Sequence, residues 1–187
     1  MTDDVVAWNG LAALLPDAEA QEVRDCWDIG EQEAGLGLLV SGLLAHHVRI
    51  SETVRAQISV LAETWGEREA LTPRIRQCRG NDAPDQVKLI EHSDDTTDGL
   101  VDGWSGQGLA DFVLIPWIVC TRCSQVLIRA HGREGWGAPS HLADHYIITS
   151  PDRATDRQVF PADSAGVAFA KLTGCSGPAL FTVRPHG

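Results

Sequence analysis

The sequence has no apolar run long enough to cross a membrane. A transmembrane helix needs about 20 consecutive apolar residues, and the longest run here, FVLIPWIVC at residues 112–120, has the length of a strand. The first residues, MTDDVVAWNG, begin with acids where a secretory signal carries a basic segment. We therefore expect a cytoplasmic protein without a membrane partner.

Basic residues are also scarce. The 187-residue chain contains 15 Lys and Arg against 26 Asp and Glu, which gives a formal net charge of −11. Because nucleic-acid binding depends on a surplus of Lys and Arg, this balance argues against a nucleic-acid partner. It favours a basic protein as partner, although solubility alone is an alternative explanation of the charge.

The common catalytic motifs are missing as well. The sequence has no G-x-S-x-G nucleophile elbow, and neither G-x-x-x-x-G-K nor G-x-G-x-x-G follows a predicted strand. The five cysteines are an odd number, and two of them form a C-x-x-C, so they do not read as a disulfide framework. They indicate thiols or a metal site. Because the common catalytic motifs are missing, we expect a protein without catalytic activity.

What the sequence does contain is two kinds of periodicity. Residues 3–77 repeat apolar side chains at helical spacing, and Ser51 is a predicted N-cap. After residue 86 the pattern changes to short runs rich in Val, Ile and Leu, with one helix near residues 163–174. We predict an α+β protein in which a helical bundle, residues 1–79, is joined by a linker, residues 80–85, to a mainly antiparallel sheet domain, residues 86–187.

One helix of the predicted bundle is unusual in its glycines. Gly35, Gly37 and Gly42 lie inside an apolar helical segment, and each costs roughly 1 kcal/mol relative to alanine. We expect them to let neighbouring helices, with large residues such as Trp8, approach closely.

A zinc site is the sharpest chemical prediction. Cys120 and Cys123 form C-x2-C, and His141 and His145 form H-x3-H. Two thiolates and two imidazoles suit tetrahedral zinc, with Cys175 or His131 as substitute ligands. A buried strand cysteine, a turn cysteine and hydrogen-bonded histidines are the alternative, as is a thiol redox pair.

Candidate contacts with a protein partner lie in three places. Glu31 and Glu33 begin a predicted helix, where stabilisation of the helix dipole is the alternative role. The segment 91–102 contains five acids and no Lys or Arg, and a solvated loop is the alternative there. A third segment offers an Arg and a Trp, residue types common at interface centres. The predicted contacts in the last two segments are Asp94, Asp95, Asp98, Asp102, Arg133 and Trp136.

Residues 13–66 resemble the immunity proteins of bacterial polymorphic toxin systems, of the Maf type. The resemblance rests on an LLP helix end, on Ile29–Glu31 as IGE, on a GLGLLVSGLL helix, on H-x-x-I-S and on a W-G stop. It implies binding and neutralisation of a cognate toxin without catalysis. The chain departs from that pattern at residues 32–34, and it adds a second domain of about 100 residues.

These observations lead to one hypothesis with two alternatives. We expect an immunity or inhibitor protein that occludes a basic toxin stoichiometrically and carries at most one structural zinc. A zinc or thiol enzyme centred on Cys120, Cys123, His141 and His145 is the first alternative. A protein-binding adaptor is the second.

Overall fold

The computed structural model describes residues 2–90, 112–133, 140, 142–150 and 153–175. Within these residues, helices precede a five-stranded antiparallel sheet. This arrangement confirms the predicted α+β class. No helix in this part of the chain is long and apolar enough to span a membrane.

Five helices make up the N-terminal part. They are α1 (Thr2–Ala12), α2 (Asp17–Asp28), α3 (Gln32–Ala45), α4 (Glu52–Thr64) and α5 (Arg68–Gln77). The two-residue strands β1 (Arg49–Ile50) and β2 (Arg79–Gly80) pair in parallel beside them. The Ser51 hydroxyl accepts a hydrogen bond from the Val54 amide, so the predicted N-cap of α4 is confirmed.

Three tryptophans from different segments pack together in this bundle, with Trp8 in the core and Trp27 and Trp65 partly buried against it. The ring of Trp8 lies 5.4 Å from that of Trp27 and 5.3 Å from that of Trp65, measured between centroids. Trp8 is 1% exposed, and its indole N–H donates to the carbonyl of Val23. A buried tryptophan needs such an acceptor, so this bond fixes α1 against α2.

Two of the three glycines of α3 are required by close packing. A Cβ at Gly35 would lie 2.8 Å from Cys26 Cβ and 2.8 Å from a ring carbon of Trp8, and a Cβ at Gly42 would lie 2.8 Å from a methyl of Leu15. A Cβ at Gly37 would meet nothing within 4 Å. The predicted packing role is therefore confirmed for Gly35 and Gly42 and is wrong for Gly37.

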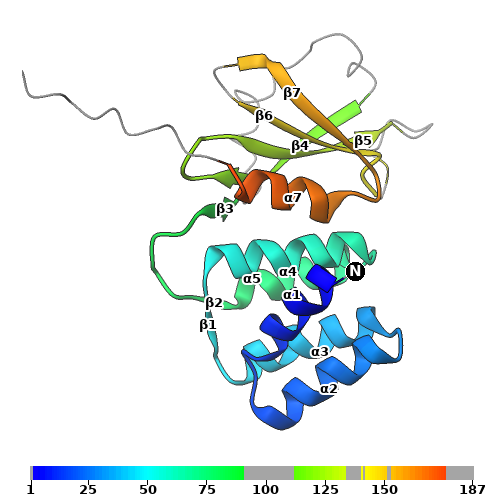
Figure 1. Cartoon of the computed structure of the whole chain (residues 1–187), viewed down its shortest axis with the longest axis vertical. Coiled ribbons are helices and arrows are strands. Elements are labelled where there is room, and N and C mark those ends of the chain that lie inside the picture. Colours follow the sequence, from blue (N-terminus) through cyan, green and yellow to red (C-terminus); the bar gives the residue numbers. More distant parts are fainter. Residues whose placement is uncertain (1, 91–111, 134–139, 141, 151–152, 176–187) are drawn as a thin grey trace, which may run out of the picture.

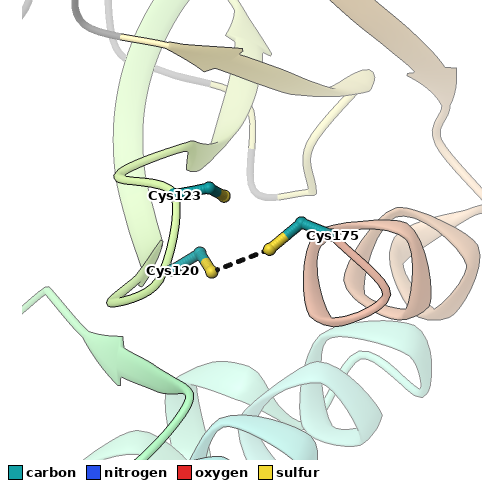
Figure 2. Close-up of side chains that lie close together, drawn as sticks. All are labelled: Cys120, Cys123 and Cys175. Atoms are coloured by element: carbon teal, nitrogen blue, oxygen red, sulfur yellow. Dashed lines mark hydrogen bonds between the residues drawn. The ribbon is translucent and has the colours of Figure 1, made fainter. Parts of the chain in front are cut away.

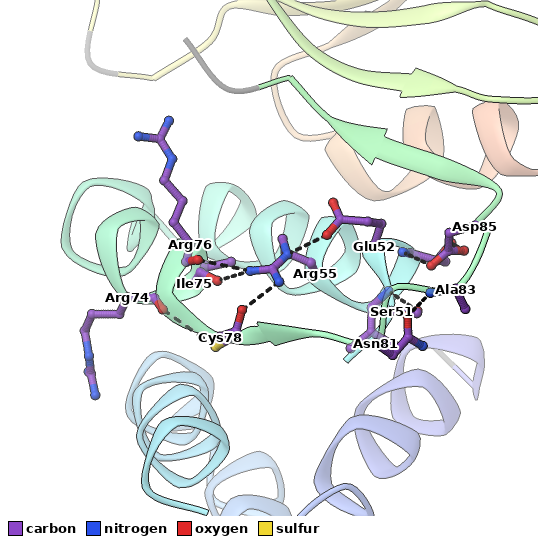
Figure 3. Close-up of polar contacts among 12 residues, drawn as sticks. Ser51, Glu52, Arg55, Arg74, Ile75, Arg76, Cys78, Asn81, Ala83 and Asp85 are labelled. Carbon is purple, nitrogen blue, oxygen red and sulfur yellow. Dashed lines mark hydrogen bonds and ion pairs between the residues drawn. The ribbon is translucent and has the colours of Figure 1, made fainter. Parts of the chain in front are cut away.

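Arg55 ties α4 to the end of α5 (Figure 3). Its guanidinium donates to the carbonyls of Ile75 (2.6 Å) and Cys78 (2.7 Å), and its Nε lies 2.9 Å from Glu52. Helix C-termini leave carbonyls without intrahelical partners. A single buried side chain thus satisfies the end of α5 and fixes the start of the segment that leads to the sheet.

The sheet is a meander in sequence order. Its strands are β3 (Val87–Leu89), β4 (Phe112–Cys120), β5 (Val126–Gly132), β6 (His145–Ser150) and β7 (Arg153–Pro161), followed by α7 (Ala165–Thr173). Alternate residues of β5 face opposite sides. Leu127 packs in the cluster that includes α7, whereas Ile128 belongs to a separate cluster.

Helix α4 lies between the bundle and the sheet. Its Ile58 and Ala62 pack with the other N-terminal helices, whereas Ala56 and Val60 pack with α7 and the sheet. Figure 1 shows the resulting layers: the sheet, then α7, then α4 and α5, with α2 and α3 beyond them. The division at residues 80–85 stays a prediction, since one helix contributes to both cores.

Candidate functional site

Cys120 and Cys123 lie on the tight turn between β4 and β5. Cys120 is the last residue of β4, and its amide donates to the carbonyl of Gln125 at 2.8 Å. The Ser124 amide returns to the carbonyl of Cys120 at 3.0 Å, and Ser124 has a left-handed φ of 59°. This compact turn directs both sulfur atoms to the same side, as the C-x-x-C spacing predicts.

The third cysteine comes from the end of α7. Cys175 follows Gly174, which ends the helix, and its Sγ lies 3.2 Å from the Sγ of Cys120. Arg122 holds the helix end against the turn, because its guanidinium donates to the carbonyls of Thr173 (2.7 Å) and Cys175 (3.1 Å). Gln86 also donates to the carbonyl of Thr173.

Figure 2 shows the three sulfur atoms converging on one space between the turn and α7. All three lie within 4.8 Å of one another; Cys120 is buried, and the other two are half-buried. A zinc ion about 2.3 Å from each sulfur places tetrahedral ligands roughly 3.8 Å apart. The spacing of the three thiols therefore fits a metal ion.

The electrostatics of the group favour one thiolate. Burial by itself raises the pKa of the Cys120 thiol, but hydrogen bonds from Cys175 and from the amides of Arg122 and Cys123 bring this pKa below its ordinary value. Burial and hydrogen bonding to Cys175 raise the pKa of Cys123 to about 12. Zinc binds cysteine as the thiolate, so an ion that binds here releases protons from the thiols on binding.

The structure corrects the predicted histidine ligands. His145 pairs with Ala130, whereas Cys120 bonds Gln125 at the opposite end of β5, roughly 15 Å along the strand. The ring of His145 instead contacts Phe112, with 5.5 Å between centroids. The prediction that His145 joins the cysteines is wrong, because β6 runs beside β5 and begins at its far end. His141 lies outside the described residues.

His131, the other substitute considered, is also remote from the turn. It is on β5 opposite Val113, and its Nδ1 lies 2.8 Å from the carbonyl of Ser140. Cys175 is the substitute that the structure brings to the two cysteines. The only feature of the sequence that marks Cys175 as a possible ligand is its position directly after Gly174, where the predicted helix ends.

The predicted partner contacts are only partly described. Glu31 and Glu33 are both exposed, at the N-cap and in the first turn of α3. Arg133 is exposed just after β5. The remaining predicted contacts, Asp94, Asp95, Asp98, Asp102 and Trp136, lie outside the described residues.

Comparison of the chain with models of protein families, with curated proteins and with solved structures finds no match. The resemblance of residues 13–66 to immunity proteins therefore stays a prediction.

Proposed function

We propose that the protein is a non-enzymatic inhibitor that neutralises a basic bacterial toxin by forming a stoichiometric complex with it. The observation that carries this proposal is an exposed acidic face on α2 and the start of α3. We define the acidic face as Glu22, Asp25, Asp28, Glu31 and Glu33, all of them exposed.

The arrangement of these acids suits a protein contact. Glu22, Asp25 and Asp28 recur every three residues and so share one side of α2, which leads directly to Glu31. Ile29, in the turn between the helices, is 72% exposed. An apolar side chain surrounded by like charges offers both a desolvated contact and long-range attraction.

Inhibition by this face needs no chemical step. A net charge of −11 raises the rate of encounter with a basic partner, and the effect weakens as salt screens the charges. Bound protein then covers the toxin surface that its substrate would reach. The acidic residues speed the encounter with the toxin, and Ile29 contributes apolar contact area to the complex.

The test is co-expression with the product of the neighbouring upstream gene, scored by rescue from its toxicity and by co-purification at a fixed ratio. Glu31→Lys, combined with Ile29→Ser, should weaken the complex and reduce rescue. Asp163→Lys is the matched control, since it makes the same charge change at an exposed residue beside α7. No complex and no rescue with the unaltered protein would end the proposal.

The second proposed property is a structural zinc held by Cys120, Cys123 and Cys175. The convergence of the three thiols from β4, its turn and α7 favours it. The ion would cross-link two segments that are distant in sequence, and the stabilisation of the fold grows with the logarithm of the free zinc concentration divided by Kd. Free zinc at about 1,000 times its Kd adds about 4 kcal/mol.

Chelation tests the zinc proposal directly. Removing bound metal from the full chain should lower the melting temperature, and adding zinc back should restore it. A protein purified without chelator that contains clearly less than one zinc per chain, and that zinc does not stabilise, would contradict this role.

A further inference from the structure

A pocket of about 250 Å³ lies between α4 and α5 on one side and β3, β4 and β5 on the other. Four arginines line it: Arg55, Arg68, Arg76 and Arg129. No acidic side chain lines it among the described residues. This concentration of positive charge contrasts with a chain whose net charge is −11.

Not every one of these arginines is available to a ligand. Arg55 is already bonded to the end of α5 and to Glu52. Arg68 and Arg129 share the fully buried carboxylate of Glu63: its Oε2 lies 2.8 Å from Arg68 Nε and 3.3 Å from Arg129 Nη1. Glu63 thus already engages both guanidiniums, and Arg129 uses its Nη1 for this contact.

Arg76 brings a further positive charge to the lining of the pocket. Its side chain is exposed, and it forms no ion pair with any residue that the structure describes. In Figure 3, Arg76 and Arg74 leave α5 in opposite directions, and Arg76 extends toward the layer of the sheet. Arg76 is thus the exposed arginine of the lining, and the residues that the structure describes do not neutralise it.

Arg129 has one hydrogen-bond donor without an acceptor. It is 6% exposed, and its buried Nε has no hydrogen-bond partner. Its guanidinium carbon lies 5.1 Å from the centroid of the Trp117 ring, which also lines the pocket. Leaving a buried charged donor unpaired is unfavourable, and a ligand oxyanion would satisfy it.

The rest of the wall is apolar or weakly polar. Leu89, Ile90 and Ile115 line the pocket together with Trp117, whose indole N–H donates to the Ser59 hydroxyl at 3.3 Å. Apolar walls with a few polar groups are typical of sites for small organic molecules. An inorganic anion alone would leave these walls without contact.

We propose that this pocket binds a small organic oxyanion: a carboxylate or phosphate group attached to a flat apolar body. The oxyanion contacts the guanidiniums of Arg76 and Arg129, and the apolar body lies against Trp117 and Ile115. The site is separate from the acidic face, since α2 and α3 lie on the far side of α4 and α5 from the sheet (Figure 1).

The experiment is a titration of the ¹⁵N-labelled full chain, observed at the indole resonance of Trp117. Trp117→Phe assigns that resonance by its loss. The probes are phenyl phosphate, benzoate, inorganic phosphate and the neutral benzyl alcohol. A saturable shift with phenyl phosphate or benzoate supports the proposal, and the stronger of the two identifies the oxyanion. If neither gives a saturable shift at millimolar concentration, or if benzyl alcohol binds as tightly, the proposal is overturned.

Two variants locate the binding. Arg76→Gln should weaken the Kd of the better probe about 10-fold, as expected for loss of a charge-assisted contact. Arg74→Gln is the matched control, because Arg74 lies on the same helix and bonds Ser41 away from the pocket; its Kd should not change. Thr72→Trp fills the pocket from α5 and should abolish binding while the circular dichroism stays native. Equal Kd values for the Arg74 and Arg76 variants, or full binding by the Thr72 variant, would overturn the site.

Discussion

The Sγ of Cys120 lies 3.2 Å from the Sγ of Cys175, although the two residues are 55 positions apart in the sequence. The contact joins the end of β4 to the end of α7, and Cys123 completes the group from the adjoining turn. Between these two points the chain forms three strands of the sheet. Any bond or ion that holds these sulfurs therefore closes the fold around the whole of β5, β6 and β7.

The ligand set leads to the first prediction. Cys175→Ser should lose bound zinc, because it removes one of three thiolates, whereas His145→Ala should retain it. Zinc per chain, measured by mass spectrometry of metals in protein purified without chelator, checks both. Cys26→Ser controls for the general loss of a thiol, since Cys26 is in α2. Retention of zinc by the Cys175 variant would exclude it as a ligand.

The cysteine group illustrates what sequence reasoning can find. A C-x-x-C turn is a local feature, so Cys120 and Cys123 followed from their spacing. The distant ligand depends on strand order and register, which spacing does not encode. In the meander, His145 lies at the end of β5 that is remote from the cysteine turn, whereas the end of α7 places Cys175 beside Cys120. The sequence therefore predicts His141 and His145 as the zinc ligands beside the two cysteines, and offers Cys175 only as one of two substitute ligands.

The second prediction concerns acid stability. Burial lowers the pKa of His131, despite the hydrogen bond to Ser140 that opposes this change. Its Nε2 is buried without a partner, so the neutral ring is the form that fits the fold. The unfolded chain protonates near pH 6.5. The stability that neutral His131 contributes is thus present above pH 6.5 and lost as the pH falls through its lower pKa in the folded state.

Urea unfolding between pH 7.5 and 5 measures this effect. His131→Gln should reduce the loss of unfolding free energy on acidification. His47→Asn is the control, since His47 is exposed and has a φ of 52° that asparagine accepts. The range stops at pH 5 because Asp85 titrates only below it. Burial raises the carboxyl pKa of Asp85, but hydrogen bonds from Thr53 and Gln86 outweigh burial and lower it. The stability that Asp85 contributes is therefore lost only at lower pH. An unchanged pH dependence in the Gln variant would count against His131.

The third prediction tests the tie between α4 and α5. Arg55→Lys should lower the free energy of unfolding by about 1–3 kcal/mol, because an ammonium cannot reproduce the fork that reaches both Ile75 and Cys78 and leaves a buried carbonyl unsatisfied. Arg79→Lys, at an exposed position of β2, should change it little. Thermal and urea unfolding monitored by circular dichroism give the comparison. Equal stability of the two variants would mean that water replaces the lost bonds.

The helices and strands themselves followed well from periodicity. The α4 start at Ser51 was predicted because an N-cap depends on three or four neighbouring residues. The five strands of the antiparallel sheet contain the runs rich in Val, Ile and Leu after residue 86. The polar network under the sheet was not predicted. Glu63 looks like any helix-surface acid in the sequence, and only the packing of α4 against β5 and β6 buries it between Arg68, Arg129 and Tyr146.

The fourth prediction compares two glycines of the same helix. Gly35→Ala should destabilise the protein by about 1–3 kcal/mol, because its Cβ would lie 2.8 Å from both Cys26 Cβ and the Trp8 ring and must displace one of them. Gly37→Ala meets nothing within 4 Å and should stabilise the helix by up to about 1 kcal/mol. Helix propensity is the same in both substitutions, so the difference in urea unfolding free energy isolates the packing term. Stabilisation by both alanines would mean that α2 and Trp8 can withdraw from α3 without cost, and that glycine at position 35 is not needed for the bundle to close.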